Sequence, residues 1–159
     1  MNVEQLMSRP VVTCGVDDSA NRAAQLMWEE DIGAVVVLDA SKRIAGIVTD
    51  RDLCMAAYTR GATLSQILVR EVMSKAVAVI GAGERLAAAE ALMRSKQVRR
   101  LPVVDAGGLL VGVVSLNDIA RVATEQRGRK SPAVGVDELV TTLGAICEPR
   151  RPQHLARRA

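Results

Sequence analysis

The chain has 159 residues and a formal net charge of +3, and 49% of its residues are hydrophobic. This length fits one domain, or two small domains that share a core, and the apolar content is sufficient for a packed interior. The sequence contains no Phe, one Trp and one Tyr. A core of aliphatic residues favours a sheet covered by helices, and the scarcity of aromatic side chains argues against a base-stacking surface for nucleic acids.

The positive charge is concentrated near the C-terminal end. Residues 119–159 carry eight Arg or Lys against four Asp or Glu, a net charge of +4, which leaves residues 1–118 at −1. The body of the chain is therefore not expected to bind nucleic acid. No apolar run approaches the ~20 residues needed to span a bilayer, so no membrane partner is expected either.

The polar residues that commonly carry chemistry are sparse. The chain has three cysteines and a single histidine, His154, without metal-ligand spacing, so no bound metal is expected. It also lacks a catalytic triad and a Walker loop, and we do not expect an enzyme. An odd number of cysteines without a signal peptide indicates a reducing, cytoplasmic location. Cys54 is expected in the core, and Cys14 and Cys147 are either unrelated thiols or a pair that forms a disulfide under oxidation.

The first half of the chain alternates strand and helix signals. Pro10 favours an extended run through Val11–Thr13. Ser19 is the expected N-cap of the first helix, and Gly33 is expected to close it. Trp28 lies off the apolar stripe of that helix, where partial burial or a subunit contact would explain it. The expected elements are a helix over 20–30, strands over 34–38 and 44–48, and a helix over 50–58.

The second half repeats the first with an offset of 66 residues. Gly46–Asp52 recurs as Gly112–Asp118, and Met7-Ser8 recurs as Met73-Ser74. An ungapped repeat of glycines, turns and apolar faces predicts two copies of one β-α-β-β-α unit. Each copy alone leaves one sheet face bare, so the copies are expected to pack sheet against sheet. We assign the copies to 1–62 and 66–124, followed by a linker, a short helix and a basic tail over 125–159.

The short helix near the C-terminal end is expected over 137–146. Its apolar side chains recur at helical spacing, which predicts one buried face. The face consists of Leu139, Val140, Leu143 and Ile146.

Each copy of the repeated motif reads Gly, two β-branched residues, Thr or Ser, two variable residues and Asp. The pattern is typical of a strand that turns at once into a helix. The hydroxyl and the carboxylate then lie at the helix N-terminus, where free backbone N–H groups attract anions. The same spacing forms a capping box with Asp in place of Glu. Capping and anion binding do not exclude each other.

The doubled unit, its two motifs and the stretch Val98–Asp105 resemble a pair of CBS domains, a Bateman module, over residues 3–123. The resemblance implies an α/β (α+β) fold: two tandem β-α-β-β-α CBS repeats packed sheet to sheet with pseudo-twofold symmetry. It further implies a stand-alone regulatory protein that binds an adenosine-containing ligand in clefts between the repeats. AMP, ADP and ATP are the expected ligands, with NAD or S-adenosylmethionine as alternatives.

The resemblance also implies a homodimer and a downstream protein that receives the signal. The alternative function is a structural or interaction homodimer whose clefts are unused.

Four of the residues to which the resemblance assigns ligand contacts belong to the two motifs. Asp52 and Asp118 would each accept hydrogen bonds from ribose hydroxyls. Thr49 and Ser115 would hold a phosphate together with the N-terminal amides of the helices.

Four further ligand contacts lie outside the motifs. Arg99 and Arg100 would neutralise phosphate charge, although solvated surface charge is the competing explanation. The strands around Thr13 and Val79 would supply an apolar slot for adenine. Positions 33 and 34 of the first copy hold Gly and Ala where the second copy has the two arginines. The two clefts are therefore not expected to be equivalent, and one could be empty or bind a different ligand.

Overall fold

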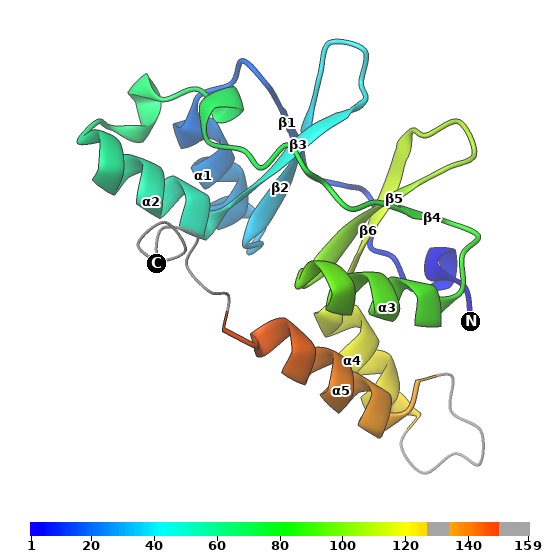
Figure 1. Cartoon of the computed structure of the whole chain (residues 1–159). Helices are drawn as coiled ribbons and strands as arrows, with labels where there is room; N and C mark the ends of the chain where they lie inside the picture. Colours follow the sequence, from blue (N-terminus) through cyan, green and yellow to red (C-terminus); the bar gives the residue numbers. More distant parts are fainter. Residues whose placement is uncertain (127–133, 150–159) are drawn as a thin grey trace, which may run out of the picture.

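Two similar units follow each other along the chain (Figure 1). The computed structural model describes residues 1–126 and 134–149. The first unit consists of β1 (Thr13–Gly15), α1 (Ala20–Glu29), β2 (Ala34–Leu38), β3 (Ile44–Thr49) and α2 (Asp50–Arg60). The second consists of β4 (Ile80–Gly81), α3 (Leu86–Lys96), β5 (Arg100–Val104), β6 (Leu110–Ser115) and α4 (Leu116–Glu125). This order confirms the doubled β-α-β-β-α unit.

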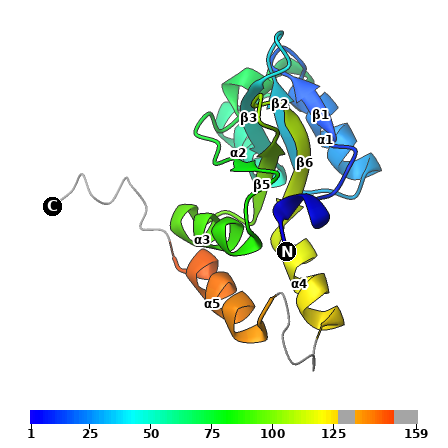
Figure 2. The same cartoon turned by 90° about the vertical axis from the view of Figure 1, so that its right-hand side faces the viewer.

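The two sheets have the same topology. Their strand orders are β1-β2-β3 and β4-β5-β6, with a parallel first pair and an antiparallel hairpin in each. The sheets lie side by side with the helices outside, and both hairpin turns extend to the same side (Figures 1 and 2). The turns touch, because Arg43 Nη1 donates a hydrogen bond to the Gly107 carbonyl at 3.3 Å. The arrangement confirms the predicted packing of one sheet against the other.

The segment that precedes each unit packs on the other unit. The 3₁₀ turn η1 (Val3–Gln5) and the buried Leu6 and Met7 belong to the apolar core of the second unit. After α2, the turns η2 (Leu64–Gln66) and η3 (Val69–Glu71) lead the chain past the first unit, whose core includes Ile67 and Val69. Each core is therefore completed by residues from the other copy, which the sequence repeat alone did not predict.

Backbone hydrogen bonds fix these exchanged segments to the hairpins. Ser8 and Val113 bond to each other in both directions, with N···O distances of 2.8 and 3.3 Å. Ser74 and Ile47 do the same at 2.9 and 3.0 Å. Each exchanged segment thus adds a short antiparallel pairing to β6 or β3, so the two units cannot separate without breaking sheet hydrogen bonds.

The glycine of each repeated motif makes room for a methionine of the exchanged segment. A Cβ atom placed on Gly46 would lie 2.6 Å from Met73 Sδ, and one placed on Gly112 would overlap Met7 Sδ. Only glycine allows this approach of side chain to strand. The recurrence of Gly46 and Gly112 in the sequence therefore reflects packing between the two units.

The helix ends depart slightly from the sequence prediction. Ser19 Oγ accepts a hydrogen bond from Arg22 N at 3.2 Å, which confirms it as the N-cap of α1. The prediction that Gly33 closes this helix is wrong. Asp31 adopts the left-handed conformation after the helix, at φ 51°, because the short side chain of Asp tolerates this region better than most residues.

A fifth helix, α5 (Val136–Cys147), packs against α3 and α4 in both views (Figures 1 and 2). Its buried face confirms the prediction in part: Ile146 is buried and Leu139 packs against the core, whereas Val140 and Leu143 are exposed and Thr142 is buried instead. Polar contacts with α3 explain the rotation. Arg94 Nη1 donates to Thr142 Oγ1 at 2.8 Å, and Gln97 Nε2 donates to the Ala145 carbonyl at 3.2 Å.

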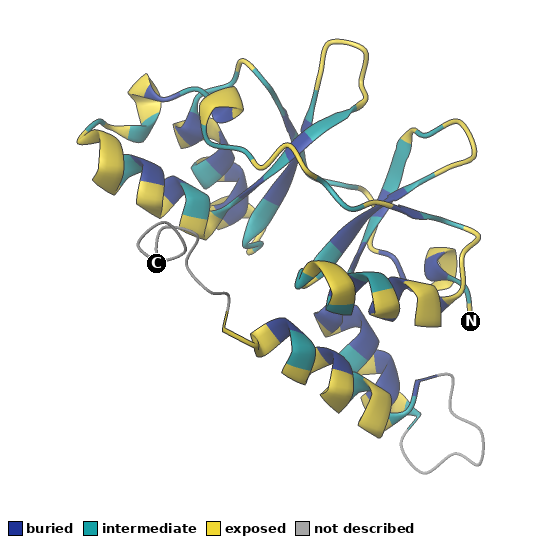
Figure 3. Ribbon diagram, viewed as in Figure 1, coloured by how far each residue is buried: buried dark blue, intermediate teal, exposed yellow. Residues whose placement is uncertain are grey.

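The outward faces of α1 and α2 are exposed (Figure 3). Trp28 on α1 is 88% exposed, so partial burial of this residue is a wrong prediction. Cys54 is also exposed, contrary to the prediction, because α2 turns Leu53 and Ala56 into the core instead. In the described part of the chain, no helix is long and apolar enough to cross a membrane. The predicted linker, in part, and the basic tail lie outside the described residues.

Glu90 on α3 is buried where α5 covers this helix. Its side chain is 2% exposed, and its Oε1 atom has no hydrogen-bond partner. Burial and the neighbouring Glu138 of α5 raise the pKa of Glu90 to about 7, although Arg94 lowers it. The carboxyl group is therefore a titratable element inside the α3–α5 contact.

We expect Gly46→Ala to destabilise the protein by about 1–3 kcal/mol, because the added methyl group overlaps Met73 and strains the exchanged segment. The matched control is Gly83→Ala, since a Cβ atom at Gly83 meets nothing within 4 Å. Urea denaturation of both variants measures the difference. Equal stabilities would show that the approach of Met73 to Gly46 is not tight.

We expect Glu90→Gln to change the pH dependence of stability. The raised pKa of Glu90 stabilises the fold most below the unfolded value of 4.5, and this contribution is lost as the pH rises through about 7. The variant and the parent should have similar free energies of unfolding near pH 4, and the variant should be more stable by about 3 kcal/mol near pH 8. Glu4→Gln, at an exposed site, is the control, and parallel pH profiles for parent and Glu90→Gln would contradict the expectation.

Candidate functional site

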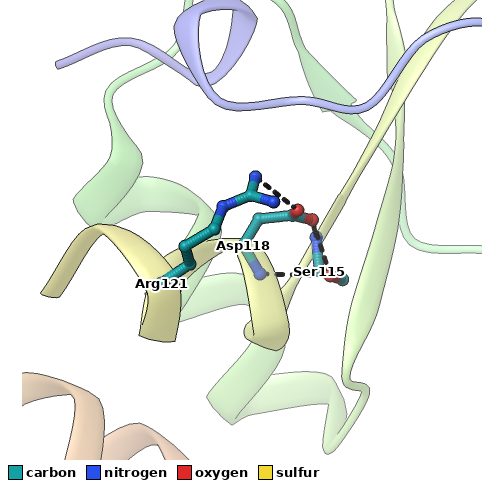
Figure 4. Close-up of polar contacts among 3 residues, drawn as sticks. All are labelled: Ser115, Asp118 and Arg121. Carbon is teal, nitrogen blue, oxygen red and sulfur yellow. Dashed lines mark hydrogen bonds and ion pairs between the residues drawn. The ribbon is translucent and has the colours of Figure 1, made fainter. Parts of the chain in front are cut away.

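Both repeated motifs form a capping box at the junction of a strand and a helix. At β3–α2, Asp52 Oδ2 accepts hydrogen bonds from Thr49 N at 2.9 Å and Thr49 Oγ1 at 2.7 Å. At β6–α4, Asp118 Oδ2 accepts from Ser115 N at 2.9 Å and Ser115 Oγ at 2.6 Å (Figure 4). The capping interpretation is confirmed for both motifs, and each carboxylate is held in one orientation.

The two carboxylates differ in their second oxygen. Asp118 is buried, and its Oδ1 accepts a hydrogen bond from Arg121 Nη2 at 3.3 Å (Figure 4). The Arg121 side chain is 64% exposed, so this ion pair contributes little to stability and is easily replaced by another donor. Met55 occupies the position in the first motif that corresponds to Arg121.

A cavity of about 310 Å³ lies between the two units. The start of β2 lines one side with Ile32, Gly33 and Ala34, and the second motif lines another with Ser115, Asn117 and Asp118. The exchanged segment closes it with Ser8 and Pro10–Val12, and the two hairpins contribute Val36, Ile47 and Val113. The cavity combines an apolar slot with a few polar groups at a helix N-terminus, as small-molecule sites commonly do.

The charged groups of the cavity are Arg100, Asp31 and Asp118. Arg100 stands at the start of β5, where it is the register partner of Ser115. Burial lowers the pKa of Arg100, Asp50 raises it, and the neighbouring Arg99 lowers it further. A single half-buried guanidinium is thus available to an anionic group in the cavity.

Of the eight residues predicted to bind ligand, the structure places Ser115, Asp118 and Arg100 around this cavity. Thr49 and Asp52 form the corresponding capping box of the other motif. Arg99 is exposed beside the cavity, and its carbonyl accepts a hydrogen bond from Leu116 N at 2.8 Å.

The other two predicted residues lie apart from this cavity. Thr13 lines a separate hollow of about 300 Å³ near the turns of the two hairpins. Val79 is exposed on the segment before β4.

Sequence reasoning missed three polar residues that line the cavity, namely Ser8, Asp31 and Asn117. Asn117 occupies a variable position of the second motif. Its position directly before Asp118 could have indicated that it lines the cavity. Asp31 carried no signal, because its place depends on the left-handed turn that follows α1.

The two candidate redox cysteines lie in different surroundings. Cys14 belongs to the buried core of the first unit, whereas Cys147 is exposed at the end of α5, which covers the second unit. Burial raises the pKa of Cys14 to about 11, with Asp18 adding to the effect and Arg22 opposing it. Cys14 is therefore a protonated thiol near neutral pH and a poor nucleophile.

Comparison with known proteins explains the doubled unit. The CBS domain model matches residues 3–58 and again residues 69–125. The chain belongs to the CBS-domain family. Its two CBS repeats are the two units described above, and the cavity lies between them.

Hypoxic response protein 1 of Mycobacterium tuberculosis is a relative of comparable length. It is 29% identical over 144 residues, which cover 91% of this chain and 92% of that protein. We interpret the short stretches Val12–Cys14 and Ala145–Pro149 as similar to this protein, and the comparison over 144 residues confirms the relationship. A crystal structure of hypoxic response protein I with two coordinated zinc ions has a TM-score of 0.69 and 30% identity, covering 76% of this chain and 98% of that one.

The zinc of that structure has no counterpart among the side chains described here. Across residues 1–126 and 134–149, no three His, Cys, Asp or Glu side chains gather into a group that could hold a metal ion.

Two further relatives differ in how much of their length this chain covers. The crystal structure of CBSX2 in complex with AMP has a TM-score of 0.68 and 25% identity, covering 78% of this chain and 96% of that one. The chain spans only 62% of an uncharacterised protein of Methanopyrus kandleri, at 33% identity over 122 residues.

Proposed function

We propose that this CBS pair is a regulatory module that binds an adenosine-containing nucleotide between its two repeats. The observation that carries the proposal is the cavity in which Ser115 and Asp118, at the N-terminus of α4, share an apolar slot with the start of β2. The AMP held by the related CBSX2 structure supports this ligand class. The proposed location is the cytoplasm, as expected for a soluble sensor of such metabolites.

The roles of the groups follow from their chemistry. Asp118 Oδ1 accepts a hydrogen bond from a ribose hydroxyl once the exposed Arg121 moves aside. Ser115 and the first amides of α4 face the phosphate side of the ligand, where the helix dipole favours an anion. Val12, Ile47 and Val113 supply the apolar surface for adenine. Arg100 partly neutralises a phosphate.

Binding at this place is suited to regulation. The lining comes from both repeats, because Gly33 and Ala34 belong to the first and Ser115 and Asp118 to the second. A ligand that touches both repeats stabilises the arrangement in which its contacts are best, and shifts the population toward that arrangement. A downstream protein that prefers the same arrangement then receives the signal.

A second candidate function is a homodimeric interaction module, which is compatible with binding. It is favoured by Trp28 and Tyr58, which are 88% and 81% exposed on the outward faces of the neighbouring α1 and α2. Large aromatic side chains left in water on two adjacent helices are typical of interaction surfaces. We propose that these helices contact a second copy of the chain.

The binding proposal is tested by thermal shift with AMP, ADP, ATP, NAD and S-adenosylmethionine. A ligand that binds only the folded state adds about 2.7 kcal/mol of stability at a hundredfold excess over Kd, which is a shift of several degrees for a domain of this size. Asp52→Ala combined with Asp118→Ala should abolish every shift, because both ribose acceptors are lost. The control is Glu4→Ala with Asp137→Ala, which removes the same charge far from the motifs. Unchanged shifts in the motif variant would refute the site.

The dimer proposal is tested by the molar mass in solution. We expect the parent chain to have twice the monomer mass by light scattering, and Trp28→Ala with Tyr58→Ala to have the monomer mass at the same concentration. Leu109→Ala, at an exposed apolar residue on a hairpin turn, is the control. A parent monomer, or a dimer in the Trp28/Tyr58 variant, would exclude this surface.

A further inference from the structure

The two motifs have the same backbone surroundings. The left-handed residues Asp31 and Gln97, at φ 51° and 50°, precede β2 and β5 at equivalent positions. Asp50 N donates to the Gly33 carbonyl at 3.3 Å, and Leu116 N donates to the Arg99 carbonyl at 2.8 Å. The backbones around the two motifs are therefore related closely by the pseudo-twofold symmetry. The two motifs differ in their side chains.

The side chains differ most at three positions that line the cavity. Gly33, Ala34 and Asn117 line the cavity of the second motif. Their counterparts, 66 residues away in the sequence, are Arg99, Arg100 and Arg51. We call the surroundings of Thr49 and Asp52, with these three arginines, the first-motif cleft. The same fold thus places small or neutral side chains at these three positions around one motif and guanidinium groups around the other, while Arg100 also lines the cavity of the second motif.

The arginines of the first-motif cleft lie together near the N-terminus of α2. A Cβ atom on Gly33 would lie 3.2 Å from Asp50 Oδ2 and 3.6 Å from Arg100 Nη2, so Asp50, the first residue of α2, and Arg100 both approach Gly33. Asp50 and Arg99 both influence the pKa of Arg100, in opposite directions. Arg51 and Arg99 are exposed and Arg100 is half-buried, which leaves the first two accessible to a ligand.

The balance of charge differs accordingly. The first-motif cleft combines the guanidiniums of Arg51, Arg99 and Arg100 with the carboxylates of Asp50 and Asp52. Arg100 is shared between the two sites, because it also lines the cavity of the second motif, where it is the single basic residue of the lining beside Asp31 and Asp118. Arg121 pairs with Asp118 but does not line that cavity. A chain of phosphates is repelled by the second set and forms charge-assisted, bidentate hydrogen bonds with the first.

We propose that the two clefts sort adenosine ligands by phosphate number. The first-motif cleft binds a nucleoside di- or triphosphate, with Arg51 and Arg99 as its specificity-determining residues. The cavity of the second motif binds an adenosine ligand with no more than one phosphate. This inference rests on the proposed function, since it assigns ligands to the two motifs of the same module.

The test uses calorimetry of the full chain with AMP and with ATP, after extraction confirms that no nucleotide was carried through purification. In Arg51→Asn with Arg99→Ala, ATP affinity should fall at least about tenfold, because each lost charged hydrogen bond is worth that much or more. AMP affinity should stay unchanged. Arg22→Ala with Arg85→Ala removes two exposed arginines elsewhere and is the control.

Single variants of the two ribose acceptors test the same assignment independently. Asp52→Asn should lower the affinity for ATP and leave that for AMP unchanged. Asp118→Asn should lower the affinity for AMP and leave that for ATP unchanged. The sorting is refuted if Asp118→Asn abolishes ATP binding, or if the arginine variant lowers the affinity for neither nucleotide or for both equally. In either case the proposal of nucleotide binding stands. If the parent chain binds no adenosine ligand at all, the proposed function itself is refuted.

Discussion

The exchange of the two leading segments is the constraint on which the rest of the structure depends. Met7 packs over Gly112 and Met73 over Gly46, and each segment pairs with a hairpin of the other repeat. Neither repeat completes its own core, because Val3 and Ile67 fill the cores of the opposite units. Folding of one repeat therefore requires the other. The walls of the cavity acquire a fixed separation for the same reason, although they belong to different halves of the chain.

This construction gives the cavity its suitability for sensing. A site built within one repeat would report only local occupancy. Here the segment Pro10–Val12 leads from the second unit's core toward β1 and lines the cavity on its way. A ligand there contacts the connection between the repeats as well as both walls. The proposed ligand would thus stabilise one arrangement of the two repeats and of the segment that connects them.

Much of the fold could be predicted from the sequence, because the ungapped repeat constrains it twice. The strand over Ala34–Leu38 and the helix over Leu86–Lys96 have the predicted bounds. Contacts between elements were harder to predict from the sequence. The buried face of α5 includes Thr142, which accepts a hydrogen bond from Arg94 of α3. The hydrophobic periodicity of the sequence does not predict this contact. At the site, the motif residues could be named, whereas the place of Asp31 depends on a left-handed turn that the sequence does not mark.

The capping box stabilises each motif without a ligand and leaves the second carboxylate oxygen available for the proposed ligand. Ser115 holds Asp118 Oδ2 through two hydrogen bonds, so the carboxylate is already oriented and loses little entropy on binding. Its other oxygen is held only by the exposed Arg121, whose pairing is worth at most about 1 kcal/mol and exchanges readily for a ribose hydroxyl. Under the proposed function, capping orients the acceptor, and the surrounding side chains select the ligand. The same capping geometry recurs at Asp52, so any difference in ligand between the two motifs must come from these side chains, such as Arg51 beside Asp52 and Arg99 of the facing repeat.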